Sequence, residues 1–148
     1  MDFSFLSKYY PYFINGAKNT ILLALFAVII AVIGGMFFAL MKMSKNPILK
    51  FVSSAYIEFI RGTPVLLQIY IIYYGLEAIG IRFPDIPALK PLLGIDFPDF
   101  MAGVITLAIN SSAYVAEIIR AGIQAVDKGQ MEASRSLGLT HAMSMRYV

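Results

Sequence analysis

The chain has 148 residues, of which 59% are apolar and only 14% are charged. Soluble domains usually carry about 25% charged residues, which their water-facing surfaces require, so this composition indicates a membrane protein. The 12 Lys and Arg residues outnumber the 9 Asp and Glu residues but form no basic run, which argues against nucleic-acid binding. Because the sequence contains no Cys, it has no disulfides, thiolate metal sites or Cys nucleophiles.

The first apolar segment, residues 19–41, contains 23 residues without a charge. At a rise of about 1.5 Å per residue, a helix of this length crosses a hydrocarbon core of about 30 Å. A secretory signal peptide has a shorter apolar core and would not be followed by further apolar segments, so we interpret residues 19–41 as a membrane span. Small residues recur at every fourth position, which is either chance or a face for close helix packing; they are Ala27, Ala31, Gly35 and Ala39.

The second apolar region, residues 51–80, is long enough for one span but contains Gly62, Thr63 and Pro64. Proline removes a backbone hydrogen bond and disfavours helix at the preceding residue, so we predict a break at residues 62–64. Unwound backbone at membrane depth usually lines a cavity, whereas a simple proline kink is the alternative interpretation.

The next segment, residues 82–98, contains four prolines and is predicted to be an external loop. A third span is predicted over residues 100–122, followed by a polar segment. Cationic loops tend to remain cytoplasmic, which places the N-terminus outside and the C-terminal segment inside. The cations that set this orientation are Lys42, Lys45, Lys50, Lys128, Arg135 and Arg146, while Lys8 and Lys18 argue weakly against it.

Two acid–base pairs with i, i+3 spacing lie in the apolar regions: Glu58 with Arg61, and Glu117 with Arg120. Each pair either neutralises itself near the interface or faces a polar pathway, because ionisable groups in a span cost about 2.5 kcal/mol or more each.

The third span has one polar face, which we expect to contact partner helices or a ligand pathway. Hydrogen bonding between helices is the alternative role for these polar groups. The face comprises Gly103, Thr106, Asn110, Tyr114, Glu117 and Ala121. The other side is expected to face lipid and comprises Val104, Ile105, Ala108, Ile109, Val115 and Ile119.

Two sequence runs, EFIRGTPVLLQIY at 58–70 and NSSAYVAEIIRAGIQAVDKGQMEASRSLGL at 110–139, carry a family resemblance. They resemble the permease subunit of bacterial ABC transporters for polar amino acids, of the histidine, glutamine and arginine type. The resemblance implies an all-α membrane protein with five transmembrane helices, of which this chain would supply three. It therefore implies a multi-pass protein of the bacterial inner membrane that is truncated at its C-terminus.

The same family has a cytoplasmic loop that docks onto the ATPase subunit, and residues 127–140 resemble it. Glu132, Ala133 and Ser134 occupy its Glu-Ala-Ala triplet, Gly138 lies at the required spacing, and Val148 falls on an Ile position. A short helix over residues 129–137 is expected, ending at Gly138, with Thr140 capping a second helix that contains a solvated His141. The expected ATPase-coupling residues are Gly129, Gln130, Glu132, Ala133, Ser134, Leu137 and Gly138.

The resemblance also implies a substrate site within the membrane. The matching positions are Glu58, Arg61, Gly62, Thr63, Asn110, Ser112 and Glu117, with Tyr114 as a lower-ranked neighbour. Arg61 is expected to bind the substrate carboxylate, and Glu58 or Glu117 its amino or cationic group.

The leading hypothesis is a permease subunit of a binding-protein-dependent importer, with no enzyme activity and no cofactor of its own. ATP would be bound by partner ATPase subunits, because the sequence has no Gly-x-x-x-x-Gly-Lys loop. The other partners would be a second permease chain, identical or different, and an external amino-acid-binding protein. One alternative is a truncated scaffold that binds the ATPase without transporting; a more remote one is an intramembrane enzyme, for which hydrolase motifs are missing.

Overall fold

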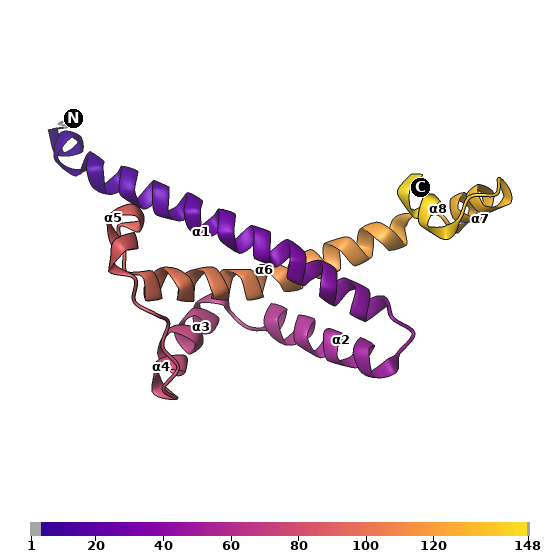
Figure 1. Ribbon diagram of the computed structural model, residues 1–148, viewed down its shortest axis with the longest axis horizontal. Helices are drawn as coiled ribbons and strands as arrows, with labels where there is room; N and C mark the ends of the chain where they lie inside the picture. Colours follow the sequence, from indigo (N-terminus) through magenta and orange to yellow (C-terminus); the bar gives the residue numbers. More distant parts are fainter. Residues whose placement is uncertain (1–3, 148) are drawn as a thin grey trace.

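The computed structural model describes residues 4–147, and every regular element in that range is helical (Figure 1). The long helices are α1 (Ser4–Met43), α2 (Pro47–Gly62) and α6 (Phe97–Ala125). Between α2 and α6 lie α3 (Val65–Tyr70), a π-helix η1 (Ile71–Gly75), α4 (Leu76–Ala78), a 3₁₀ turn η2 (Pro87–Leu89) and α5 (Lys90–Leu93). The chain then forms α7 (Lys128–Ser136) and α8 (His141–Tyr147).

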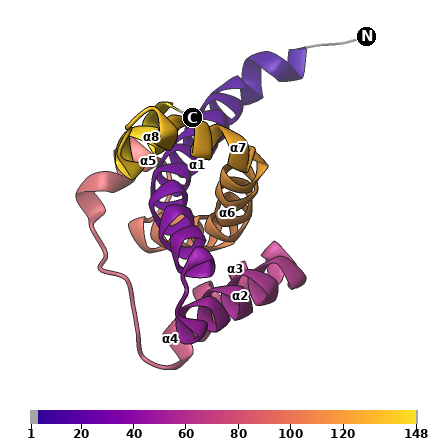
Figure 2. The ribbon, with the colours of Figure 1, turned by 90° about the vertical axis from the view of Figure 1, so that its right-hand side faces the viewer.

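Helices α1 and α6 cross closely, and α2 packs beside both of them (Figures 1 and 2). The four small residues Ala27, Ala31, Gly35 and Ala39 are all buried. A methyl group added to Gly35 would lie 2.6 Å from the Cγ1 of Val115 on α6. The interpretation of the small residues as a helix-packing face is therefore confirmed, because only side chains this small let the two backbones approach so closely.

Two apolar clusters fill the space between the helices. One joins α1, α2 and α6 through Ala39, Ile57, Ile60, Ala113 and Ala116. The other joins α5 to α6 and the first half of α1 through Leu93, Phe100 and Val104. The ring of Phe26 on α1 meets that of Phe100 edge to face, with ring centres 6.0 Å apart.

Helix α1 is longer than the predicted span of residues 19–41. Its 40 residues correspond to about 60 Å, twice the thickness of the hydrocarbon core, so it extends beyond the bilayer. By length and composition α1 and α6 qualify as membrane spans, and α2 with the segment 65–78 adds a third if the bent pair counts as one span. Helix α6 likewise extends past both ends of the predicted range 100–122.

The second apolar region is divided at Thr63 and Pro64, which both have extended backbone with ψ of 142° and 134°. The helix does not resume in register, because the axis of residues 65–78 makes an angle of 105° with that of α2. The arm formed by α3, η1 and α4 consequently extends away from the crossing of α1 and α6 (Figure 1).

The expectation that one side of the third span faces lipid is wrong. None of its six residues is exposed: Val104, Ile105, Ala108, Ile109, Val115 and Ile119. Val104 is buried in the cluster that α5 and α1 form on that side of α6, and Val115 meets Gly35 of α1. The sequence pattern assigned this side to lipid because it did not include α5 and α1 as packing partners. On the expected inward face, Thr106 is buried but Tyr114 keeps 45% of its surface exposed.

At the other end of α6, the two short helices form a compact hairpin. The Asp127 carboxylate caps α7 by accepting a hydrogen bond from the backbone N–H of Gly129, with 2.6 Å between N and Oδ1. Gly138 has a left-handed backbone, with φ of +84°, which ends the helix where expected. Thr140 then accepts a hydrogen bond from the N–H of Met143, which confirms it as the cap of α8. Val148, the expected Ile position of the loop motif, lies outside the described residues.

The contact between α1 and α6 predicts a strong asymmetry between glycines. Gly35→Ala should lower the free energy of unfolding by about 1–3 kcal/mol, because the added methyl group overlaps Val115 and approaches the backbone of Ala116. Gly16→Ala, on the same helix, is the matched control, since a methyl group added there would meet no neighbouring atom within 4 Å. Thermal unfolding of the protein in detergent measures both; equal stability of the two variants would contradict the packing.

Candidate functional site

The break after α2 exposes backbone carbonyl groups that have lost their helical partners. The hydroxyl of Thr63 donates to the carbonyl oxygens of Phe59 and Ile60, at 3.0 and 3.3 Å. The side-chain amide of Gln68 also donates to the oxygen of Ile60, at 2.8 Å, and to Thr63 at its carbonyl and hydroxyl oxygens. Two polar side chains thus close the broken helix end, which apolar surroundings require because water is absent there.

The same Gln68 side chain connects the break to α6. Its Oε1 accepts a hydrogen bond from Nδ2 of Asn110, with 3.1 Å between the two atoms. Gln68 is itself buried, so all of its polar atoms are directed to protein partners. The sequence assigned Asn110 to the site but not Gln68; the missing information was the bend that turns Gln68 back onto Ile60.

Arg61 and Glu58 lie on the exposed side of α2 and do not neutralise each other. The guanidinium carbon of Arg61 lies 5.3 Å from the ring centre of Tyr114, a cation–π contact. Among residues 4–147 the Glu58 carboxylate has no ion pair or hydrogen bond. Gly62 next to them is exposed, and an added methyl group there would meet nothing within 4 Å. This side of α2 therefore presents one cation and one anion around an open position.

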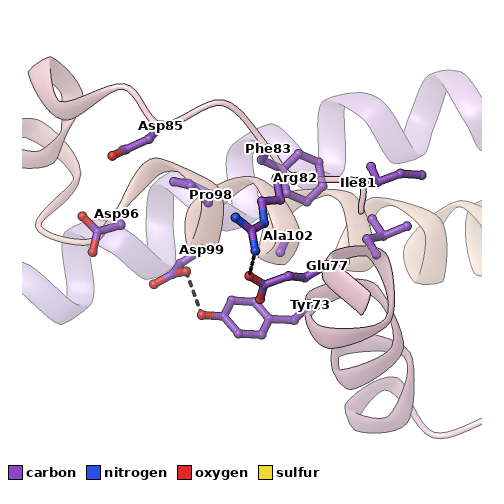
Figure 3. A pocket seen from close by; sticks show the side chains of 11 residues that line it. Tyr73, Glu77, Ile81, Arg82, Phe83, Asp85, Asp96, Pro98, Asp99 and Ala102 are labelled. Carbon is purple, nitrogen blue, oxygen red and sulfur yellow. Dashed lines mark hydrogen bonds and ion pairs between the residues drawn. The ribbon is translucent and has the colours of Figure 1, made fainter. Parts of the chain in front are cut away.

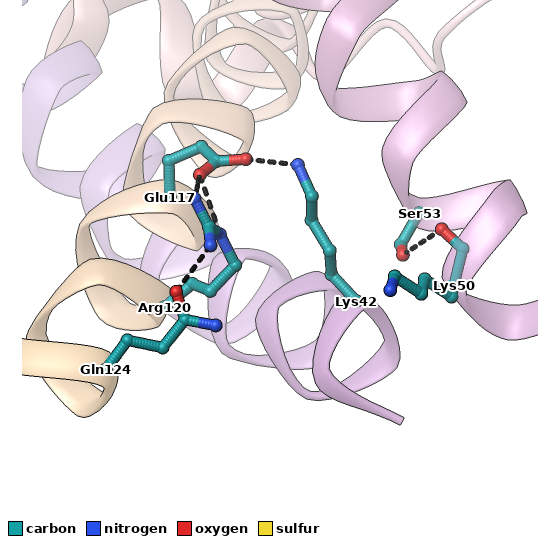
Figure 4. A network of polar contacts seen from close by, with 6 residues as sticks. All are labelled: Lys42, Lys50, Ser53, Glu117, Arg120 and Gln124. Carbon is teal, nitrogen blue, oxygen red and sulfur yellow. Dashed lines mark hydrogen bonds and ion pairs between the residues drawn. The ribbon is translucent and has the colours of Figure 1, made fainter. Parts of the chain in front are cut away.

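Glu117, in contrast, is held by two cations (Figure 4). It forms an ion pair with Lys42 at the end of α1, and its Oε2 lies 2.7 Å from a terminal nitrogen of Arg120. Arg120 continues the network to the amide oxygen of Gln124, at 2.6 Å. Only 17% of the Glu117 and Lys42 side chains is exposed, so the pair forms in largely desolvated surroundings. The sequence placed Lys42 in a loop, because nothing in its local pattern shows that α1 ends beside α6.

Ser112 lies apart from Asn110, in the core between α1, α2 and α6. Its hydroxyl donates to the carbonyl oxygen of Ile109 and lies 2.7 Å from the hydroxyl of Tyr56. The Tyr56 ring is stacked on Phe38, with ring centres 3.9 Å apart. The surroundings of Ser112 are those of a packing residue, and it does not open toward the Arg61 side of α2.

The predicted coupling residues fall on two sides of α7. Gln130, Glu132 and Ala133 are exposed, and Leu137 just after the helix exposes 83% of its surface. Ser134 is buried instead, and its hydroxyl donates to that of Ser144 on α8, at 2.7 Å. Gly129 and Gly138 shape the two ends of α7 through the Asp127 cap and the left-handed turn. Ser134 therefore orients α7 against α8, whereas the other side remains open to a partner.

A pocket of about 400 Å³ lies at the opposite end of the protein, between α4, the loop and the start of α6 (Figure 3). The Tyr73 hydroxyl donates to Asp99 at 2.9 Å, and Arg82 pairs with Glu77 at 3.2 Å. Nearby, Lys90 pairs with Asp96 at 2.8 Å, and this hydrogen bond raises the pKa of Lys90 above its ordinary value. The loop between α4 and α6 is thus held in place by ion pairs and a hydrogen bond. The prediction of a surface loop did not include these contacts.

Comparison with known proteins identifies the family. The family described as "Binding-protein-dependent transport system inner membrane component" matches residues 31–148. The chain belongs to this family. It is 36% identical over 148 residues to "Probable amino-acid permease protein YxeN" of Bacillus subtilis, covering all of this chain and 61% of that protein. It is 40% identical over 146 residues to "Putative glutamine transport system permease protein GlnP" of Rickettsia prowazekii, covering 96% of this chain and 61% of that protein.

A solved structure shares the fold as well. The "Crystal structure of an amino acid ABC transporter with histidines" superposes with a TM-score of 0.79 at 54% sequence identity, over 100% of this chain and 63% of the other. The chain of this transport component thus spans about three-fifths of the length of the relatives it matches.

The contacts of Glu117 predict that substitutions of Lys42 and Glu117 have coupled effects on the stability of this protein. Lys42→Met should lower the free energy of unfolding by about 1–3 kcal/mol, because Glu117 keeps Arg120 but loses a partner in desolvated surroundings. Adding Glu117→Gln should recover part of that loss, whereas Lys45→Met, which removes an exposed cation nearby, should have little effect. Thermal unfolding of the unsubstituted protein, the single variants Lys42→Met and Glu117→Gln, and the double variant gives the coupling free energy; strict additivity of the two changes would argue against the ion pair.

Proposed function

We propose that the chain is the membrane-spanning part of a permease subunit of a binding-protein-dependent ABC importer for polar amino acids. The family match and the names of its relatives support this assignment. The structural observation that carries it is the broken second span, where Arg61 and Glu58 stand un-neutralised beside an open glycine. Charges are expensive in a span and are retained there mainly for function.

In this proposal the chain contributes three of the five membrane-spanning helices of a permease, with its N-terminus outside and α7 in the cytoplasm. The arrangement of charges supports this orientation, since the end of α1 and the start of α2 lie toward the same side of the molecule as α7 (Figure 1). These segments and the turn between them carry Lys42, Lys45 and Lys50. The acidic loop and its pocket lie toward the other end, where an external amino-acid-binding protein would approach.

The proposed substrate contacts are Glu58, Arg61, Gly62 and Thr63, whereas Asn110 is proposed to act on the break through its hydrogen bond to Gln68. The planar guanidinium of Arg61 can bind the α-carboxylate of an amino acid through two hydrogen bonds, and Glu58 can accept one from its ammonium group. For Glu117 and Ser112 we propose structural roles, because the Glu117 carboxylate is paired with two cations and Ser112 lies in the core between α1, α2 and α6.

ATP would be bound and hydrolysed by two ATPase subunits that receive the open side of α7, and the permease itself would need no cofactor. A second permease chain would complete the pathway. The exposed Leu137 directly after α7 supports this docking role, because it presents a large apolar side chain beside the exposed Glu132 and Ala133.

Substitution of Arg61 tests the proposed substrate site. Arg61→Ala in the full transporter should reduce amino-acid uptake to background, because the carboxylate loses its only proposed cationic partner, while Arg61→Lys should retain part of the uptake. Copurification of the ATPase measures assembly, which should be unchanged, and Lys45→Ala controls for the loss of a cation. If uptake continued normally in the alanine variant, a scaffold that binds the ATPase without this site would be the better assignment.

Substitution of Leu137 tests whether α7 docks onto the ATPase subunit. Leu137→Asp should weaken copurification of the ATPase subunit by about tenfold or more, since a carboxylate would enter an apolar contact. Leu137→Met is the matched control, because it keeps an apolar side chain of similar volume at the same position. Undiminished copurification of the ATPase with the aspartate variant would show that α7 is not the docking element.

A further inference from the structure

We propose that Gln68 is a positioning residue of the transport cycle, whose side-chain amide transmits movement of α6 to the substrate contacts at the helix break. The proposal rests on the function proposed above. It adds a mechanical connection between α7, where the ATPase would bind, and the substrate contacts at the helix break. Three observations support it: the contacts of Gln68 at the break, its bond to α6, and the continuity of α6 toward α7.

At the break, Gln68 acts on the backbone that carries the substrate contacts. Its Nε2 donates to Ile60 O at 2.8 Å, to Thr63 O at 3.2 Å and to Thr63 Oγ1 at 2.8 Å. Ile60 directly precedes Arg61 and Gly62, so the three bonds hold both sides of the segment 61–62. Displacement of the Gln68 amide therefore displaces the backbone to which the Arg61 side chain is attached.

Toward α6, the amide has one further partner, Asn110, whose Nδ2 lies 3.1 Å from Gln68 Oε1. A second side-chain bond between the arm and α6, from Tyr73 to Asp99, lies among exposed groups near the outer pocket. The bond to Asn110 is the more buried of the two, because Gln68 is buried and Asn110 is partly buried, so water competes less for this bond. It is therefore the stiffer connection between the broken span and α6.

From Asn110 onward, α6 continues as one uninterrupted helix to Ala125, about 22 Å further along its axis. Two residues then lead into α7, with Asp127 serving as the cap of that helix. A movement imposed on α7 by an ATPase thus reaches Asn110 through a rigid element and reaches the break through Gln68. The amide also has a donor group and an acceptor oxygen, which lets it hold both helices at once.

The experiment measures the ratio of ATP hydrolysed to amino acid taken up. It uses the complete transporter in proteoliposomes, with labelled histidine, glutamine and arginine tested separately. Gln68→Leu should raise the ratio by about tenfold while the complex still assembles, because hydrolysis continues but the break no longer follows α6. Asn110→Leu removes the bond to α6 and leaves the contacts of Gln68 at the break in place. It should raise the ratio similarly, and the double variant should be no worse than either single one.

A purely structural role would give a different result: ATPase activity and uptake would both fall in proportion to the amount of complex, and the ratio would not move. That outcome, or additive effects of the two substitutions, overturns the proposal. If Gln68→Leu does not assemble, the ratio for Asn110→Leu decides alone.

A second measurement separates this proposal from the proposed function. This chain contains no Cys, so spin labels can be attached at introduced cysteines replacing the exposed Leu66 on α3 and Ile118 on α6. The distance distribution between them should be broader in Gln68→Leu than in the unsubstituted complex. If the unsubstituted protein transports no amino acid, the importer assignment fails, whereas an unchanged distance distribution overturns the role of Gln68 by itself.

Discussion

A helix that breaks in apolar surroundings leaves carbonyl groups that need hydrogen-bond donors, and in this protein the buried amide of Gln68 supplies several of them. Gln68 closes the end of α2 together with Thr63, and leaving such groups unpaired in apolar surroundings would cost several kcal/mol each. With the end of α2 closed in this way, the chain turns by 105° into the next helical segment. The bend in turn leaves Arg61 and Gly62 at the open end of a helix instead of within a continuous one.

The charged residues divide by the same reasoning. A buried or partly buried charge is stable when it has a partner, and Glu117 has two, supplied by α1 and by its own helix. Glu58 and Arg61 form no ion pair with each other, although their i, i+3 spacing on α2 would allow one. The difference follows from position: Glu117 lies where α1 and α6 meet, whereas α2 turns its Glu58 side away from both.

The sequence was sufficient for the properties that depend on local pattern. It predicted an all-helical membrane protein, the helix-packing face of Ala31 and Gly35, and the Thr140 cap of α8, because each depends on composition or on spacing along one element. It did not predict the partners that a distant element supplies. Lys42 reaches Glu117 because α1 continues beyond its apolar segment, and Val104 is buried because α1 and α5 both pack onto that side of α6. Neither the extension of α1 nor the return of the loop has a signature in the residues themselves.

The Ser134–Ser144 bond shows how a coupling element can be stable and still have one free side. A helix of nine residues is marginal by itself in water, because the cost of nucleation is spread over few hydrogen bonds. The buried hydroxyl pair, the Asp127 cap and the left-handed Gly138 all stabilise α7 from the side of α8 or from its ends. None of these contacts uses the side chain of Ala133 or Leu137. The stabilising contacts and the surface left for a partner are therefore separate, so binding on the open side requires no loss of the interactions that form the helix.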